Sequence, residues 1–183
     1  KVYNDGNSIN PNAYPTLLYN AMINPLVGYG IAGALWYQGE SNAGRADQYN
    51  TSFPLMINDW RNRWKDSFPF YFVQLTHWQA GGGTSQNGGS TWAELREAQQ
   101  NTLRLSNTGM AVITDIGNTV DIHPRNKQDV GKRLTLQALA KTYGIETKSL
   151  SPAYSTMSLK DGKAALTFNN KYNGLVVKNK YGY

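Results

Sequence analysis

Three short apolar runs alternate along the chain with longer amphipathic segments, and this alternation constrains the fold more than any other feature. The runs cover residues 31–38, 70–75 and 110–115, and their length and composition suit buried strands. Strands that alternate with helices favour a parallel sheet with helices on both faces. The sequence therefore predicts an α/β fold with three layers.

Four helices are predicted around these strands. Apolar residues recur every three or four positions between Asp47 and Lys65, which is the period of an amphipathic helix, although Pro54 should kink or restart it. Thr91 and Glu94 have the spacing of a capping box, and Asn126 is a candidate N-cap. The predicted helical ranges are 13–27, 47–65, 91–104 and 126–143.

The pattern changes after Lys148. Residues 154–159, 163–168 and 175–177 resemble short strands, and Asp161-Gly162 between the first two is a hairpin signal. Three short strands are too few for a stable domain of their own. We expect an α/β domain over residues 1–147 that is incomplete at its N-terminus, followed by the start of a β-rich unit over 148–183.

Composition removes several classes of function. The chain of 183 residues has no cysteine and only two histidines, which excludes thiol chemistry and matches no zinc spacing. Its net charge of +6 is spread over the chain rather than gathered with aromatic residues on one face, so we expect no nucleic-acid partner. No apolar stretch is long enough to span a membrane, and no glycine-rich phosphate loop is present. We expect no metal and no cofactor.

Two polar clusters follow predicted strands, where open α/β sheets bind their ligands. They are residues 38–42 and 115–123. His123 lies in the second cluster with Asp121 two positions before it, so the carboxylate could orient the imidazole of a general base. His77, the other histidine, has no carboxylate within ten positions and is expected at the rim of a site.

Ser41 stands in the sequence GESNA, which nearly matches the G-x-S-x-G nucleophile elbow of serine hydrolases. Ser41, Asp121 and His123 also follow the chain order of the α/β-hydrolase triad. Against this assignment, position 43 is alanine rather than glycine, and residues 42–44 are expected to prolong the loop. A complete hydrolase that uses Ser41 is therefore kept as an alternative.

Several longer blocks carry a resemblance to a known family. WYQGESNAGRADQY is followed in order by DWRNRW, FPFYFVQL, WAELREAQ, GMAVITDIG and DIHPRNKQDVGKRL. Together they resemble the sialate O-acetylesterases, which belong to the SGNH (GDSL-like) hydrolases and are similar to acetylxylan-esterase-like carbohydrate esterases. The resemblance covers residues 13–145. It implies a flavodoxin-like α/β/α esterase that removes O-acetyl groups from sugars without a cofactor.

The resemblance also implies roles for individual residues. His123 matches the catalytic base, and Gln38 stands where SGNH enzymes place an oxyanion-hole side chain. Glu40 matches the triad acid of some related esterases and is favoured over Asp121, because the wider family has D-x-x-H where this chain has D-x-H. No match to the family's G-Q-S-N-like nucleophile motif is present, so we expect the nucleophilic serine in the N-terminal remainder of the same protein, outside this chain.

The expected substrate is an acetylated sugar of the sialic acid or hemicellulose type. Gly39, Asn42, Tyr37 and His77 are expected to bind it, and a secreted or periplasmic location is expected for the protein. The alternative from another class of function is a non-catalytic carbohydrate-binding module that has kept the esterase fold.

Overall fold

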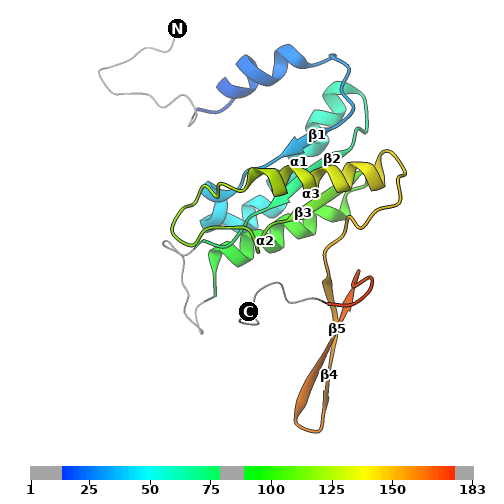
Figure 1. The fold of residues 1–183 in the computed structure, drawn as a ribbon. Coiled ribbons are helices and arrows are strands. Elements are labelled where there is room, and N and C mark those ends of the chain that lie inside the picture. The colour runs from blue at the N-terminus through cyan, green and yellow to red at the C-terminus, as the bar shows by residue number, and fades with distance from the viewer. Residues whose placement is uncertain (1–13, 79–88, 176–183) are drawn as a thin grey trace.

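A parallel three-stranded sheet lies at the centre of the chain, whose structure is a computed structural model that describes residues 14–78 and 89–175 (Figure 1). The strands lie side by side in the order of the sequence, and both pairs are parallel. They are β1 (Ala34–Trp36), β2 (Phe70–Gln74) and β3 (Thr108–Val112). The predicted parallel α/β architecture is confirmed.

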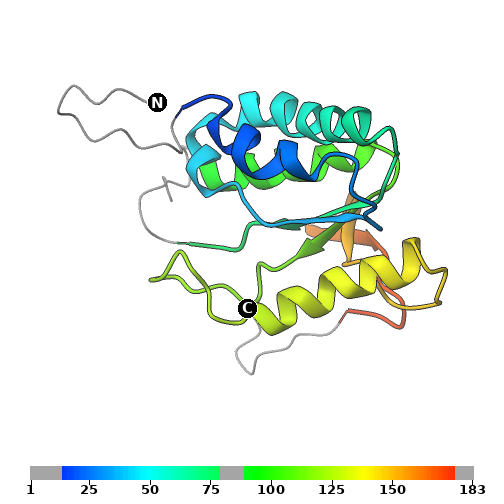
Figure 2. The ribbon, with the colours of Figure 1, turned by 90° about the horizontal axis from the view of Figure 1, so that it is seen from above.

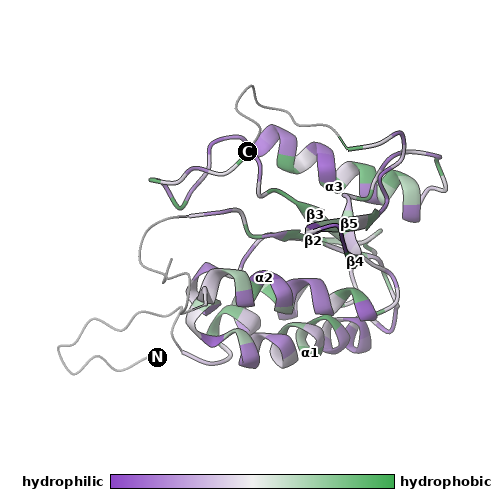
Figure 3. Ribbon diagram, turned by 90° about the horizontal axis from the view of Figure 1, so that it is seen from below, coloured by the Kyte–Doolittle hydropathy of each residue, from purple (hydrophilic) through white to green (hydrophobic). Residues whose placement is uncertain are grey.

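Helices cover both faces of this sheet. The pair α1 (Ala46–Trp64) and α2 (Thr91–Asn101) lies on one face, and α3 (Lys127–Lys141) lies on the other (Figure 2). The strands β2 and β3 are coloured mainly as hydrophobic, whereas hydrophilic and hydrophobic residues alternate along the helices (Figure 3). Because α3 contacts β2 and β3, it leaves the same face of β1 without a helix above it in the described residues.

Two hydrophobic cores lie on opposite faces of the central strand β2. All five of its residues are buried, as expected for a strand covered on both faces. Its side chains alternate, so Phe70 and Phe72 pack into the core under α1 and α2, whereas Tyr71 and Val73 pack into the core under α3.

Pro54 lies inside α1 without interrupting it. A proline has no N–H for the carbonyl four residues earlier, which here belongs to Asn50. The guanidinium of Arg104 donates to that carbonyl at 3.3 Å and replaces the missing donor. A long-range contact that the helical pattern does not contain therefore lets α1 run from Ala46 to Trp64.

Side-chain N-caps begin both α2 and α3, but the cap of α2 is not the residue predicted. Asn126 caps α3 as expected, because its Oδ1 accepts the N–H of Asp129. Helix α2 is instead capped by Ser90, whose Oγ accepts the N–H of Ala93 at 3.3 Å, so Thr91 is its first helical residue rather than its cap.

The N-terminal helix predicted over 13–27 is irregular in the structure. A π-helical turn, η2 (Tyr19–Ile23), leads into a 3-10 turn, η3 (Asn24–Leu26), that contains Pro25. This segment is held to the end of α1, where the indole N–H of Trp64 donates to the carbonyl of Tyr29 at 3.0 Å.

A β-hairpin follows the α/β unit. Its strands are β4 (Ala153–Lys160) and β5 (Lys163–Asn169), and its turn residues Asp161 and Gly162 both have positive φ, as the predicted turn requires. Of the third predicted strand, 175–177, only Leu175 is described and it is not in a strand. Within the described part of the chain, no helix is long and apolar enough to cross a membrane.

Candidate active site

Three loops leave the carboxyl ends of the parallel strands and meet at one edge of the sheet. They begin after Trp36, Gln74 and Val112. Every site residue expected from the sequence lies on these loops or on the 3-10 helix η4 (Glu40–Arg45), which joins the first loop to α1.

The side chain of Gln38 is held on both sides of its amide. The hydroxyl of Tyr49 donates to Oε1 at 3.1 Å, and Nε2 donates to Oδ1 of Asn42 at 2.7 Å. Nε2 has two hydrogens, and Asn42 accepts one of them. The geometry thus leaves Gln38 with a second N–H that can be offered to a ligand oxygen.

A buried amide fixes the backbone beneath Gln38. Gln99, which is 1% exposed on α2, donates from Nε2 to the carbonyls of Gln38 and Val73 at 3.2 and 3.3 Å. Its Oε1 accepts the backbone N–H of Leu75 at 2.9 Å. All hydrogen-bonding groups of this amide are used, and they join the ends of β1 and β2.

Tyr37 lies between two charged residues of the site. The ammonium of Lys127 is 4.5 Å from the centre of its ring. Burial raises the pKa of the Tyr37 hydroxyl, and the negative charge of Glu40 raises it further. Tyr37 is therefore a neutral hydrogen-bonding group beside the Glu40 carboxylate at ordinary pH.

The third loop presents His123 to solvent. Its side chain is 86% exposed, and Nδ1 lies 3.8 Å from Oδ1 of Asp121, which instead accepts the backbone N–H of His123 at 2.9 Å. Among the described residues, no hydrogen bond or ion pair joins His123 to Glu40. The structure brings Asp121 near His123 but does not bring Glu40 to it.

His77 has a defined ring orientation. Its Nδ1 lies 2.7 Å from the carbonyl of Thr114, so Nδ1–H is the donor. The neutral ring then carries its lone pair on Nε2. The neighbouring Trp78 packs against Trp92, with ring centroids 5.3 Å apart.

Ser41 is exposed on the first turn of η4. The helix begins at Glu40, so the expected loop extension over residues 42–44 is wrong. In the described part of the chain, no hydrogen bond links the Ser41 hydroxyl to either histidine, and its carbonyl accepts from Arg45 at 3.3 Å. The structure does not assemble a triad around Ser41.

Asp115, at the start of the second polar cluster, has a structural partner. Arg133 of α3 contacts its carboxylate through both Nη atoms, at 2.5 and 2.7 Å, and also donates to the carbonyl of Val112. This bidentate pair fixes the start of the loop that carries Asp121 and His123 against α3.

Residues 4–140 match the family described as carbohydrate esterase, sialic acid-specific acetylesterase. The chain belongs to that family. The resemblance found in the sequence is thereby confirmed, and so is its position along most of the α/β unit.

A solved structure and several curated proteins match most of this chain. A carbohydrate acetylesterase from Xanthomonas citri is 47% identical, matches 87% of this chain and 37% of its own, and superposes with a TM-score of 0.80. This confirms the expected SGNH-type α/β/α fold. The sialate O-acetylesterase of Mus musculus is 32% identical over 90% of this chain, and that of Homo sapiens is 36% identical over 70%. The chain spans about a third of the length of these curated relatives, 34% and 28% respectively.

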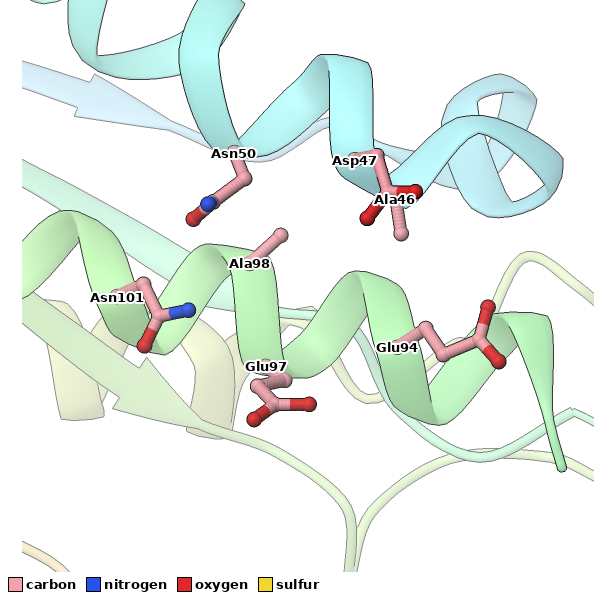
Figure 4. A pocket seen from close by; sticks show the side chains of 7 residues that line it. All are labelled: Ala46, Asp47, Asn50, Glu94, Glu97, Ala98 and Asn101. Carbon is pink, nitrogen blue, oxygen red and sulfur yellow. The ribbon is translucent and has the colours of Figure 1, made fainter.

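A separate acidic hollow of about 410 Å³ lies between α1 and α2 (Figure 4). Asp47 and Asn50 line it from α1, and Glu94, Glu97 and Asn101 line it from α2. Within residues 14–78 and 89–175, no group of three or more acidic or histidine side chains is placed to hold a metal ion.

Two residues that shape the site were missed in the sequence. Tyr49 fits the apolar periodicity of α1, and Gln99 lies inside the helical range 91–104, but neither pattern indicates a polar partner at the site. Gln99 carried a usable signal, since it is a polar residue four positions after Leu95 on the buried face of α2. A buried glutamine at such a position needs polar partners, and loop ends are the usual source of them.

Proposed function

We propose that this chain forms part of the active site of a carbohydrate O-acetylesterase, which hydrolyses acetyl esters on sugars by a Ser–His–acid mechanism. One observation carries the proposal: the Gln38 amide is fixed by Tyr49 and Asn42 at the carboxyl end of β1, with an N–H left to donate. This is the kind of preorganised donor that an ester-cleaving site needs. Membership of the acetylesterase family supports the assignment.

In the proposed reaction, a serine hydroxyl attacks the acetyl carbonyl and His123 accepts its proton. Negative charge develops on the carbonyl oxygen, and the Gln38 N–H stabilises it. His123 then protonates the sugar oxygen as it leaves. His123 then takes a proton from water, which attacks the acetyl-enzyme; as the bond to the serine oxygen breaks, His123 returns the proton to that oxygen and acetate is released.

We infer that the attacking serine comes from a part of the protein outside this chain. Ser41 is exposed and has no contact with a histidine in the described residues. The edge of β1 supports this inference, because within residues 14–78 and 89–175 β1 pairs with β2 alone, and Leu35 on it is 65% exposed. A further strand beside β1 would end at the same edge of the sheet as Gln38.

The carboxylate that orients His123 is either Asp121 or Glu40. Asp121 is 3.8 Å from Nδ1, whereas no hydrogen bond or ion pair joins Glu40 to His123 in the described residues. Because His123 is largely exposed, we propose that the loop packs down when the serine-bearing segment is in place.

The substrate we propose is an acetylated sugar, of the sialic acid or hemicellulose type. Gly39 lets the backbone bend at the site, Asn42 supports Gln38, and Tyr37 and His77 are proposed to contact the sugar. We further propose a secreted or periplasmic protein in which residues 1–147 belong to the esterase domain and residues 148–183 begin a β-rich unit.

The test is His123→Ala in the full-length protein, assayed with O-acetylated sialic acid and with acetylxylan. Loss of the base should lower kcat by about 10²- to 10⁴-fold while sugar binding, measured by calorimetry with a deacetylated sugar, is kept. His77→Ala is the matched control and should change KM more than kcat. Unchanged turnover in His123→Ala would refute the proposed base, and binding without turnover in the wild type would indicate a carbohydrate-binding module.

A further inference from the structure

We propose that Tyr49 is a positioning residue that fixes which end of the Gln38 amide faces the reacting ester. This inference rests on the proposed function of Gln38 as oxyanion donor. The hydroxyl of Tyr49 contacts Gln38 alone among the described groups proposed for the reaction, at 3.1 Å from Oε1 and 3.5 Å from the backbone carbonyl.

The orientation of the Gln38 amide decides whether it stabilises or repels the negative charge that develops on the ester oxygen. The two ends of a glutamine amide are nearly equal in size, but one donates hydrogen bonds and the other only accepts them. With Nε2 toward the ester, Gln38 stabilises the developing oxyanion. After a flip, Oε1 would face the same negative charge and repel it.

The backbone N–H of Leu75 determines the orientation of the Gln99 amide. The N–H of Leu75 donates to Gln99, so the acceptor there must be Oε1. The Nε2 group of Gln99 is then the end that points toward β1, where it donates to the carbonyl of Gln38. Gln99 therefore presents donors, not an acceptor, on the side where Tyr49 lies.

The side-chain N–H groups of Trp36 and Gln99 lie near the oxygen of Tyr49. Burial raises the pKa of Tyr49 to about 12, although the N–H groups of Trp36 and Gln99 beside its oxygen act in the opposite direction. Trp36 Nε1 is buried and has no hydrogen-bond partner among the described residues. The hydroxyl hydrogen therefore points at Gln38, where Oε1 at 3.1 Å is the nearer acceptor and the backbone carbonyl at 3.5 Å is the farther one.

Tyr49 is itself rigid and always protonated in the working range of an esterase. Its side chain is 4% exposed and its ring packs against Phe53, with centroids 5.1 Å apart. The hydroxyl therefore donates to Gln38 throughout neutral pH. Oε1 is held toward α1, and Nε2 is held toward Asn42 and the edge of the sheet.

The experiment is Tyr49→Phe in the full-length protein, which removes the hydroxyl and keeps the ring. We expect kcat for an acetyl ester to fall about fivefold to tenfold with KM unchanged, since the amide can then flip between two orientations. Rates are normalised to folded enzyme, measured by circular dichroism at the assay temperature. Tyr71→Phe is the matched control, because Tyr71 is also buried and its hydroxyl bonds to Thr142 on the other face of the sheet.

A double-substitution cycle separates positioning from stability. If Tyr49 acts through Gln38, then Tyr49→Phe changes kcat by less than about twofold in a Gln38→Ala background. An equal loss in both backgrounds, or an unchanged kcat in Tyr49→Phe alone, overturns the inference while leaving the proposed function in place. A wild-type protein without esterase turnover overturns both, and a Gln38→Ala variant with full turnover removes the oxyanion role on which the inference rests.

Discussion

At the scale of single residues, Gly39 tests how tightly the loop after β1 is fixed. Its φ of +148° is one that side chains rarely adopt, and a Cβ there would lie 3.1 Å from Nε2 of Gln99 and 3.2 Å from Leu95. We expect Gly39→Ala to lower the free energy of unfolding by about 1–3 kcal/mol, measured by urea denaturation. It should also reduce turnover, because it displaces Gln99 from the carbonyl of Gln38.

Gly131 is the control for this change. It lies within α3, and a Cβ added there would meet no atom within 4 Å beyond its own helix backbone and chain neighbours, so Gly131→Ala should stabilise the protein by about 0.5–1 kcal/mol. If both substitutions change the free energy of unfolding in the same direction, the contacts around Gly39 do not determine the effect of Gly39→Ala.

What the sequence could predict at this scale depended on whether a residue lies in a recognisable block. Gln38, Glu40 and His123 stand in such blocks, and the structure places all three at the carboxyl edge of the sheet. Tyr49 and Gln99, the hydrogen-bond partners of Gln38, were not predicted, because their role depends on long-range contacts between α1, α2 and the strand ends. A helical pattern predicts that such residues are buried, but it does not identify the atoms that their polar ends meet.

At the scale of elements, α1 carries two arginines with opposite environments. Arg61 is 8% exposed and donates to the carbonyls of Phe68 and Asn107, which join the end of α1 to the starts of β2 and β3. Arg61→Met would leave these carbonyls without a donor. We expect a loss of about 2–4 kcal/mol in the free energy of unfolding, measured by chemical denaturation.

The control is two residues away on the same helix. Arg63 is exposed and pairs with Asp59 one turn earlier, at 2.7 Å. Arg63→Met should leave the denaturation midpoint unchanged, since exposed ion pairs contribute little. Equal effects of the two substitutions would contradict the role assigned to Arg61.

Element boundaries were harder to predict than the elements themselves. The first strand was expected over 31–38, but only residues 34–36 have pairing partners, since they lie opposite 70–72 of β2. The third strand begins at Thr108 rather than Met110, because its register follows the start of β2. The hydrophobic pattern therefore predicted the order of the helices and strands, whereas the pairing between strands determined where each strand begins and ends.

At the scale of the whole molecule, the layers are unequal. Helices α1 and α2 cover one face of the sheet, whereas α3 covers only β2 and β3 on the other (Figure 2). On that second face Leu35 is 65% exposed, although it lies in a strand. Parallel strands are normally covered on both faces. Because the curated relatives are about three times as long, we expect further chain to cover this part of the sheet.

This expectation can be tested with two leucines of equal exposure. Leu55 on α1 is also 65% exposed, but it lies on the outer surface of a helix whose other face is already packed. In the full-length protein, Leu35→Asp should lower the free energy of unfolding by about 2–4 kcal/mol, because it would bury a charge under the additional chain. Leu55→Asp should change it by less than about 0.5 kcal/mol. The isolated 183-residue chain should show no acetyl-ester turnover, because we propose that the attacking serine lies outside this chain. Equal tolerance of both substitutions, or full activity of the isolated chain, would refute this arrangement and return Ser41 as the candidate nucleophile.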